Sequence, residues 1–262
     1  MFIIGELING MYKQVERAIR EKDKKAIQKI ANEQVSSGAN CLDVNCGPAS
    51  KDPLADMQWL VETIQEVVQV PLSLDSTKPK VIEAGLKLVK KKAVINSTSA
   101  DQEKLDVFLP LAKQYSSFLI GLTMDKKGVP QDKDQRLELA AAIAAGCQEA
   151  DFPLSDLFLD PIVLPVNVAQ PQARHVLDSI HEFKLLANPS PKTIVGLSNV
   201  SQGTCTRNLI NRTFLIMALG AGLDAAILDP LDKELMDSLI TAELILDKQI
   251  YCDSYLDAYR KK

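Results

Sequence analysis

The sequence predicts an α/β protein, a single-domain (β/α)8 barrel (TIM barrel) spanning residues 1–262. Short apolar runs recur at intervals of roughly thirty residues, and a longer stretch with helical spacing follows each of them. Eight such runs are present, and neither a linker nor a low-complexity segment interrupts them. A chain of this length with alternating strands and helices fits a closed barrel better than an open doubly wound sheet.

The eight expected strands are residues 2–5, 41–44, 72–74, 93–95, 118–122, 157–159, 193–197 and 225–228, with eight helices between them. After the second strand, Asp52 is expected to cap a helix and Pro53 to occupy its first turn. The apolar residues of that helix form one stripe that we expect to be buried: Leu54, Met57, Leu60, Val61, Ile64, Val67 and Val68. Gly38 and Gly222 each precede a strand, where a left-handed conformation would end a helix.

Composition and charge exclude several classes of protein. Apolar residues make up 46% of the chain, and 30 basic against 34 acidic residues give a net charge of −4, so nucleic acid is not expected as a partner. No apolar run approaches the ~18 residues that span a bilayer, so we expect a cytoplasmic protein without a membrane partner. Five scattered cysteines and two histidines argue against a disulfide framework, a metal site and a Ser-His-Asp triad.

Polar side chains follow the expected strands, at the end of a barrel where active sites lie. They are Glu6, Asn9, Asp43, Asn45, Asp75, Asn96, Thr123, Asp160, Ser198, Asn199 and Asp229. Carboxylates and amides with almost no cation favour a neutral heterocycle rich in N–H donors, because one carboxylate accepts two parallel bonds. The alternative is that Asp75, Asn96 and Asp160 only cap the helices that follow. Composition and spacing leave both interpretations open.

Glycines lie near the ends of three expected strands, at Gly5, Gly121 and Gly196. A strand without a side chain at such a position lets another group approach its backbone closely. We therefore expect these three glycines to make room for a flat ring.

Three segments resemble the pterin-contact motifs of the pterin-binding barrel family, which includes dihydropteroate synthase and the folate domain of cobalamin-dependent methionine synthase. They are residues 74–78 (LDSTK), 95–98 (INST) and 159–161 (LDP). Residues 38–45, residues 196–202 (GLSNVSQ), Arg207 and residues 211–212 are similar to the methyltransferase branch of that family. The resemblance covers essentially the whole chain, with one departure, since Leu7 stands where this branch usually has arginine.

The resemblance implies transfer of a methyl group from nitrogen-5 of 5-methyltetrahydrofolate to Co(I) of a corrinoid iron-sulfur protein, a step of the reductive acetyl-CoA pathway of carbon fixation. It implies that Asp160 binds the pterin 2-amino group and the neighbouring ring N–H. Asp75 and Asn96 would bind the reduced-ring edge, and Asn199 would be the catalytic residue near nitrogen-5. The outer site and the folate tail would meet Ser198, Gln202 and Arg207.

We expect no cofactor bound by this chain. It lacks the D-x-H-x-x-G cobalamin signature, so the corrinoid would arrive on the partner protein. The resemblance also implies a homodimer. Because neither histidine nor lysine lies at a strand end, a proton would reach nitrogen-5 through water or an extended network. The alternatives are a pterin enzyme like dihydropteroate synthase, although residues 5–10 lack the basic loop it would need, and a non-catalytic folate-binding protein.

Overall fold

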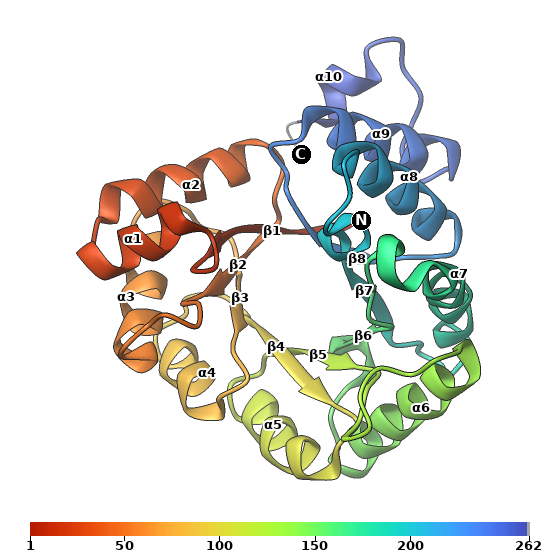
Figure 1. Cartoon of the computed structure of the whole chain (residues 1–262), viewed down its shortest axis with the longest axis horizontal. Coiled ribbons are helices and arrows are strands. Elements are labelled where there is room, and N and C mark those ends of the chain that lie inside the picture. Colours follow the sequence, from red (N-terminus) through yellow and green to blue (C-terminus); the bar gives the residue numbers. More distant parts are fainter. Residues whose placement is uncertain (261–262) are drawn as a thin grey trace.

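Eight parallel strands close into a barrel that is surrounded by helices in the computed structural model, which describes residues 1–260 (Figure 1). The strands are β1 (Phe2–Asn9), β2 (Cys41–Asn45), β3 (Leu72–Asp75), β4 (Val94–Ser99), β5 (Phe118–Leu122), β6 (Leu157–Asp160), β7 (Lys192–Gly196) and β8 (Ala225–Leu228). Each strand pairs with its neighbour in chain order, and β8 pairs with β1. The predicted (β/α)8 barrel is confirmed.

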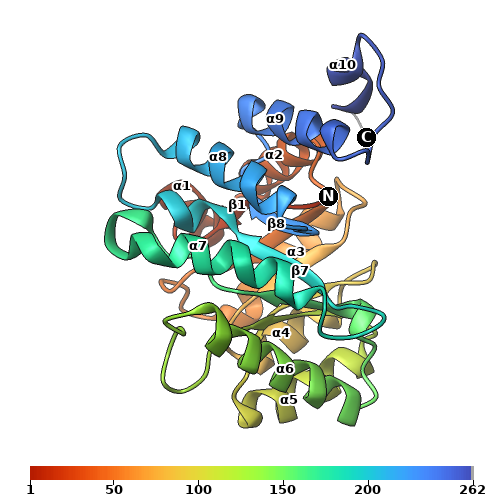
Figure 2. The ribbon, with the colours of Figure 1, turned by 90° about the vertical axis from the view of Figure 1, so that its right-hand side faces the viewer.

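The helices are α1 (Lys13–Glu21), α2 (Lys24–Ser36), α3 (Pro53–Gln65), α4 (Pro79–Leu86), α5 (Gln102–Gln114), α6 (Lys133–Glu149), α7 (Val166–Phe183), α8 (Arg207–Gly220), α9 (Lys233–Ile245) and α10 (Tyr255–Tyr259). There are also two short 3-10 helices. The first, η1 (Leu154–Asp156), directly precedes β6, and the second, η2 (Leu197–Ser201), directly follows β7. The expected eight helices are too few, because β1 is followed by two and α10 lies beyond α9 on the outside of the molecule (Figure 2). Within residues 1–260, no helix is both long and apolar enough to cross a membrane.

Local sequence signals set the helix ends. Asp52 accepts a hydrogen bond from the backbone N–H of Ala55, and Pro53 begins α3, as predicted. Gly38 and Gly222 both have a φ of +104°, a backbone conformation that residues other than glycine rarely adopt. These two glycines turn the chain from a helix into the next strand.

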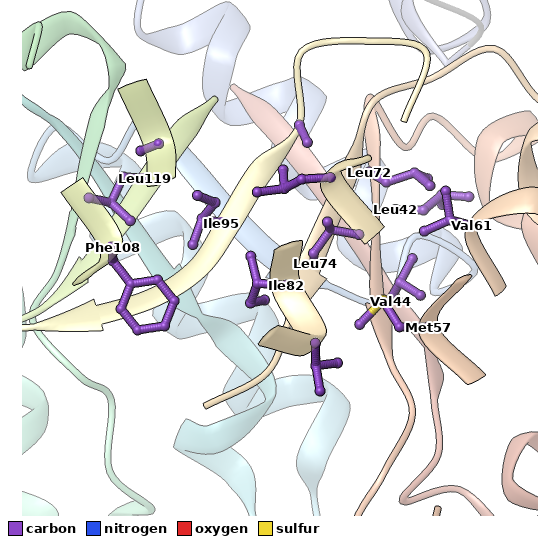
Figure 3. Packing of buried hydrophobic residues seen from close by; sticks show 14 of the residues in the cluster. Leu42, Val44, Met57, Val61, Leu72, Leu74, Ile82, Ile95, Phe108 and Leu119 are labelled. Carbon is purple, nitrogen blue, oxygen red and sulfur yellow. The ribbon is translucent and has the colours of Figure 1, made fainter. Parts of the chain in front are cut away.

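The stripe expected on α3 is buried at Met57, Leu60, Val61, Ile64 and Val68. Figure 3 shows Met57 and Val61 beside Leu42 and Val44 of β2, so this face covers the outside of the sheet. The prediction is wrong for Leu54 and Val67, which are 44% and 38% exposed. Leu54 lies in the first turn of α3, and Val67 lies two residues beyond its end.

Among the side chains that point into the barrel, two successive layers set the position of the polar groups. The lower layer is an apolar cluster formed by Ile4, Cys41, Val94, Ile120, Phe158, Ile194 and Ala225. Because strand side chains alternate between faces, the residue two positions further along each strand points the same way. Those positions hold Glu6, Asp43, Asn96 and Asp160 on four of the strands. The strands therefore place polar groups directly above an apolar floor.

The glycines near the strand ends have a different role from the expected one. A Cβ on Gly5 would lie 2.4 Å from Oε1 of Gln34 in α2, and a Cβ on Gly121 would lie 3.0 Å from Ile143 in α6. Both glycines face helices, so the expectation that they admit a flat ring is wrong. Only Gly196 lies beside a candidate site residue, since its Cβ would be 3.0 Å from Nδ2 of Asn199.

Candidate active site

Side chains from β2, β3 and β4 form a hydrogen-bonded network around Asp43, and a separate hydrogen-bonded pair, at the mouth of the barrel. Oδ1 of Asp43 accepts from the hydroxyl of Ser73 at 2.7 Å and from Nδ2 of Asn96 at 3.1 Å. Nδ2 of Asn45 donates to Oδ2 of Asp75 at 2.6 Å. The side-chain amide of Asn96 thus uses one of its two N–H donors inside the network, and its oxygen is left to accept from a ligand.

The alternative that the predicted residues are only helix caps is rejected. The residue before α4 is Lys78, the residue before α5 is Asp101, and the residue before α7 is Pro165. None of the three helices is capped by Asp75, Asn96 or Asp160. These side chains are available for another role, and they share one end of the barrel.

Asp160 ends β6 and is 8% exposed. Its Oδ1 accepts from the backbone N–H of Ile162 at 2.7 Å, while its backbone carbonyl accepts from the N–H and the hydroxyl of Thr123. Burial raises the pKa of Asp160 to about 7, although the Ile162 hydrogen bond and the positive charge of Arg136 oppose the shift. The second oxygen of this carboxyl makes no hydrogen bond within the described chain.

The other carboxyl groups of the site also hold protons unusually well. Burial, followed by the charge of Asp75, raises the pKa of Asp43 to about 8, and burial raises the pKa of Asp75. Burial raises the pKa of Glu6 to about 7, opposed by its hydrogen bond from Ser198. The strand ends lack histidine and lysine, but the pKa values of Glu6 and Asp160, about 7, are close to that of histidine.

At the mouth of the barrel, the end of β1 contacts the segment that follows β7. The hydroxyl of Ser198 donates to Oε1 of Glu6 at 2.6 Å. Arg207 donates from Nη2 to the carbonyl of Ser198 at 3.4 Å and from Nε to the hydroxyl of Ser201 at 3.2 Å. Glu6 is therefore hydrogen-bonded to Ser198, and Arg207 holds the segment that follows β7.

Asn199 and Gln202 are exposed on the same segment. The side chain of Asn199 makes no hydrogen bond with any described residue, and its backbone carbonyl accepts from the N–H of Gln202 at 3.2 Å. The missing side chain of Gly196 leaves room beside the Asn199 amide. Both residues remain predicted site residues, and neither side chain is held by a hydrogen bond to the described residues.

Sequence reasoning missed two buried residues. Asp43 was noted as a strand-end carboxyl, but its central place in the network was not; its position two residues after the inward-facing Cys41 is the signal that could have found it. Arg136 is fully buried in the first turn of α6. Its neighbours in the sequence give no sign of that burial, because they are polar and helical.

Within residues 1–260, no group of three histidines, cysteines or carboxylates could hold a metal ion.

The fold and the mouth together define a small-molecule-binding barrel whose polar groups are carboxyls and amides above an apolar floor. The chain belongs to the family of pterin binding enzymes, which matches residues 12–229. The resemblance seen in the motifs is thereby confirmed.

Two relatives are similar to the chain over most or all of its length. The chain is 30% identical over its whole length to the methylcorrinoid:tetrahydrofolate methyltransferase of Eubacterium limosum, of which it covers 97%. It is 28% identical, over 87% of its length, to the methionine synthase of Mycobacterium leprae, and it spans 20% of that longer protein.

Two dihydropteroate synthases share the fold. The structure from Coxiella burnetii superposes with a TM-score of 0.68 at 14% identity, covering 93% of this chain and 94% of that one. The structure from Yersinia pestis superposes with a TM-score of 0.67 at 18% identity, covering 94% of each chain. At such identities the likeness concerns the fold alone.

Proposed function

We propose that this protein is a methyltransferase that moves the methyl group of 5-methyltetrahydrofolate from nitrogen-5 to the Co(I) centre of a corrinoid protein. The observation that carries the proposal is the full-length 30% identity to a protein named for methyl exchange between a corrinoid and tetrahydrofolate. The ring of carboxyls and amides supports it, since a pterin edge is rich in N–H donors.

The site residues have distinct proposed roles. Asp160 accepts from the pterin 2-amino group and the adjacent ring N–H, while Asp75 and the free oxygen of Asn96 take the reduced-ring edge. Asn199 lies near nitrogen-5 and stabilises its protonated form. Ser198, Gln202 and Arg207 line the outer site and the tail.

The amine leaves poorly unless it is protonated, so a proton has to reach nitrogen-5 before or during transfer. Carboxyl groups with pKa values of about 7 to 8, at Glu6 and Asp43, supply a store of protons at neutral pH. As the N5–methyl bond breaks, its electron pair stays on the protonated nitrogen, and the methyl group bonds to cobalt. Most of the remaining catalysis is in-line positioning of the two reactants.

The relative's name gives methylcorrinoid as the donor, the reverse of the direction proposed here. We propose the forward direction, with a corrinoid iron-sulfur protein as partner in the reductive acetyl-CoA pathway. We further propose that the chain acts as a cytoplasmic homodimer and that it carries no corrinoid of its own. Light scattering after gel filtration tests the dimer, and metal analysis of the purified protein tests the absence of cobalt.

The deciding experiment mixes the protein with 5-methyltetrahydrofolate and a reduced corrinoid iron-sulfur protein and follows the loss of Co(I) absorbance. Rapid loss that requires all three components is the expected result. Folate binding without loss would indicate a carrier, and absence of folate binding would favour a pterin enzyme of the synthase kind. Homocysteine in place of the corrinoid protein serves as the control acceptor and is expected to receive no methyl group.

A further inference from the structure

Arg136 is a fully buried arginine that lies outside the ring of site residues. Its Nε donates to the carbonyl of Pro161 at 2.7 Å, and its Nη1 donates to the carbonyl of Asp132 at 3.0 Å. Its Nη2 donates to Oε1 of Gln172 in α7 at 2.8 Å, and Gln172 donates in turn to the carbonyl of Gln131. One guanidinium thus ties the start of α6 to the β6–α7 loop and to α7.

This contact reaches the site because Pro161 directly follows Asp160. One residue further on, the N–H of Ile162 donates to Oδ1 of Asp160, and Ile162 has a φ of +63°. Val163 of the same loop is buried, so the loop is packed against the protein. A residue other than glycine in the left-handed conformation costs free energy, and it persists only where the surrounding structure holds it. The Arg136–Pro161 hydrogen bond supplies such a hold.

Charge provides a second link. A buried guanidinium without a carboxylate partner is costly, and within the described chain Arg136 makes no ion pair. The charged groups that act on it are Asp132 and Asp160, and the charged group that acts on Asp160 is Arg136. The positive charge lowers the pKa of the Asp160 carboxyl, against the burial that raises it.

We propose that Arg136 is a positioning residue for Asp160: it fixes the loop that orients the carboxyl and places a positive charge behind it, so that the carboxyl meets the pterin edge as a carboxylate. The inference rests on the proposed pterin-binding role of Asp160. A purely structural arginine would support folding but would leave the pH dependence of binding unchanged.

The test measures the dissociation constant of 5-methyltetrahydrofolate by calorimetry from pH 5.5 to 8.5. Affinity is expected to rise with pH as Asp160 loses its proton. Arg136→Met removes the charge and is expected to move the midpoint upward by about one pH unit, the scale of the effect of a nearby opposite charge. Arg136→Gln is the second neutral variant, to be used if the first does not fold.

Three controls separate charge from packing. Arg136→Lys keeps the charge and is expected to hold the midpoint within about 0.3 unit, by the same scale. Arg174→Met removes an exposed arginine that pairs with Asp178 on α7, and is expected to change nothing. In an Asp160→Asn background, Arg136→Met is expected to move no midpoint.

Two outcomes would overturn the inference. One is a folded neutral variant with an unshifted midpoint, and the other is an equal shift in the Asp160→Asn background. Failure of the wild-type protein to bind 5-methyltetrahydrofolate at every pH would instead contradict the proposed function.

Discussion

Asp43 and Asn96 belong to β2 and β4, which are not neighbours in the barrel, yet Nδ2 of Asn96 lies 3.1 Å from Oδ1 of Asp43. The same oxygen accepts from Ser73 of the intervening strand. This one carboxyl therefore fixes which end of the Asn96 amide faces a ligand. The Asp43 carboxyl is itself buried, so its proposed effect on a ligand is exerted through Asn96.

Removing the Asp43 carboxyl should weaken folate binding without touching the folate. Asp43→Ala leaves the Ser73 hydroxyl and the Asn96 amide without their partner, at about 1–3 kcal/mol for each unpaired buried group. We expect affinity for 5-methyltetrahydrofolate to fall at least tenfold, while Asp43→Asn, which retains an acceptor, loses less. Calorimetry on both variants checks this. Equal affinities for the alanine and asparagine variants would mean that Asp43 does not orient Asn96.

Asp160→Asn tests the main proposed pterin contact. Charge-assisted hydrogen bonds contribute roughly 1.5–3 kcal/mol each. Two such bonds are expected between Asp160 and the pterin, and the asparagine amide cannot fully replace either of them. Affinity should drop tenfold or more while the circular dichroism spectrum stays native. A folded variant that binds as tightly as the wild type would remove Asp160 from the site.

Asn199→Ala tests the reaction step. If the Asn199 amide stabilises the protonated nitrogen-5, its contribution grows toward the transition state, so kcat should fall roughly a hundredfold and affinity should fall less. The forward rate should also rise as pH falls, because protonation activates the leaving group. Stopped-flow single-turnover rates from pH 5 to 8 check both statements. A rate within about threefold of wild type would show that Asn199 only forms the turn, where its loss costs about 1 kcal/mol of stability.

The raised carboxyl pKa values predict how stability depends on pH in the ligand-free protein. Asp43 has a folded pKa of about 8 against an ordinary value of 3.8, so between these values the folded state binds more protons than the unfolded state. Its contribution to the free energy of unfolding therefore falls as pH rises, by up to about 1.4 kcal/mol per unit. Urea unfolding of wild type and Asp43→Asn from pH 5 to 9 measures the difference. We expect the wild type to lose stability relative to the variant as pH rises to about 8, the folded pKa of Asp43, and little more above it.

Gly5→Ala tests the packing of β1 against α2. The new Cβ would displace the Gln34 amide, which accepts from the N–H of Leu7 at 3.0 Å. We expect a loss of about 1–3 kcal/mol in the free energy of unfolding, the usual effect of overpacking. Gly220→Ala is the matched control, because nothing lies within 4 Å of its added Cβ. Similar stabilities for the two variants would contradict this account of Gly5.

The sequence predicted the barrel well because its signals are local: apolar runs mark strands, and Asp52 and Pro53 mark a helix start. The sequence could place Asp75, Asn96 and Asp160 at one end of the barrel, because the carboxyl ends of parallel strands meet there. The bond between Asp43 and Asn96 depends on how strands two apart are staggered around the closed barrel, and no local pattern encodes this stagger. Arg136 was missed because its burial depends on α7 and the β6–α7 loop, which lie far along the chain.

The apolar layer formed by Ile4, Cys41, Phe158 and their neighbours limits how deeply a ligand can enter the barrel. The polar positions lie only two residues above it, a rise of roughly 7 Å along a strand. A flat ring can therefore rest across the opening but cannot sink into the barrel. Under the proposed function, the carboxyls and amides would contact the edge of the pterin, and the face of the ring turned away from the barrel would stay accessible to the corrinoid protein.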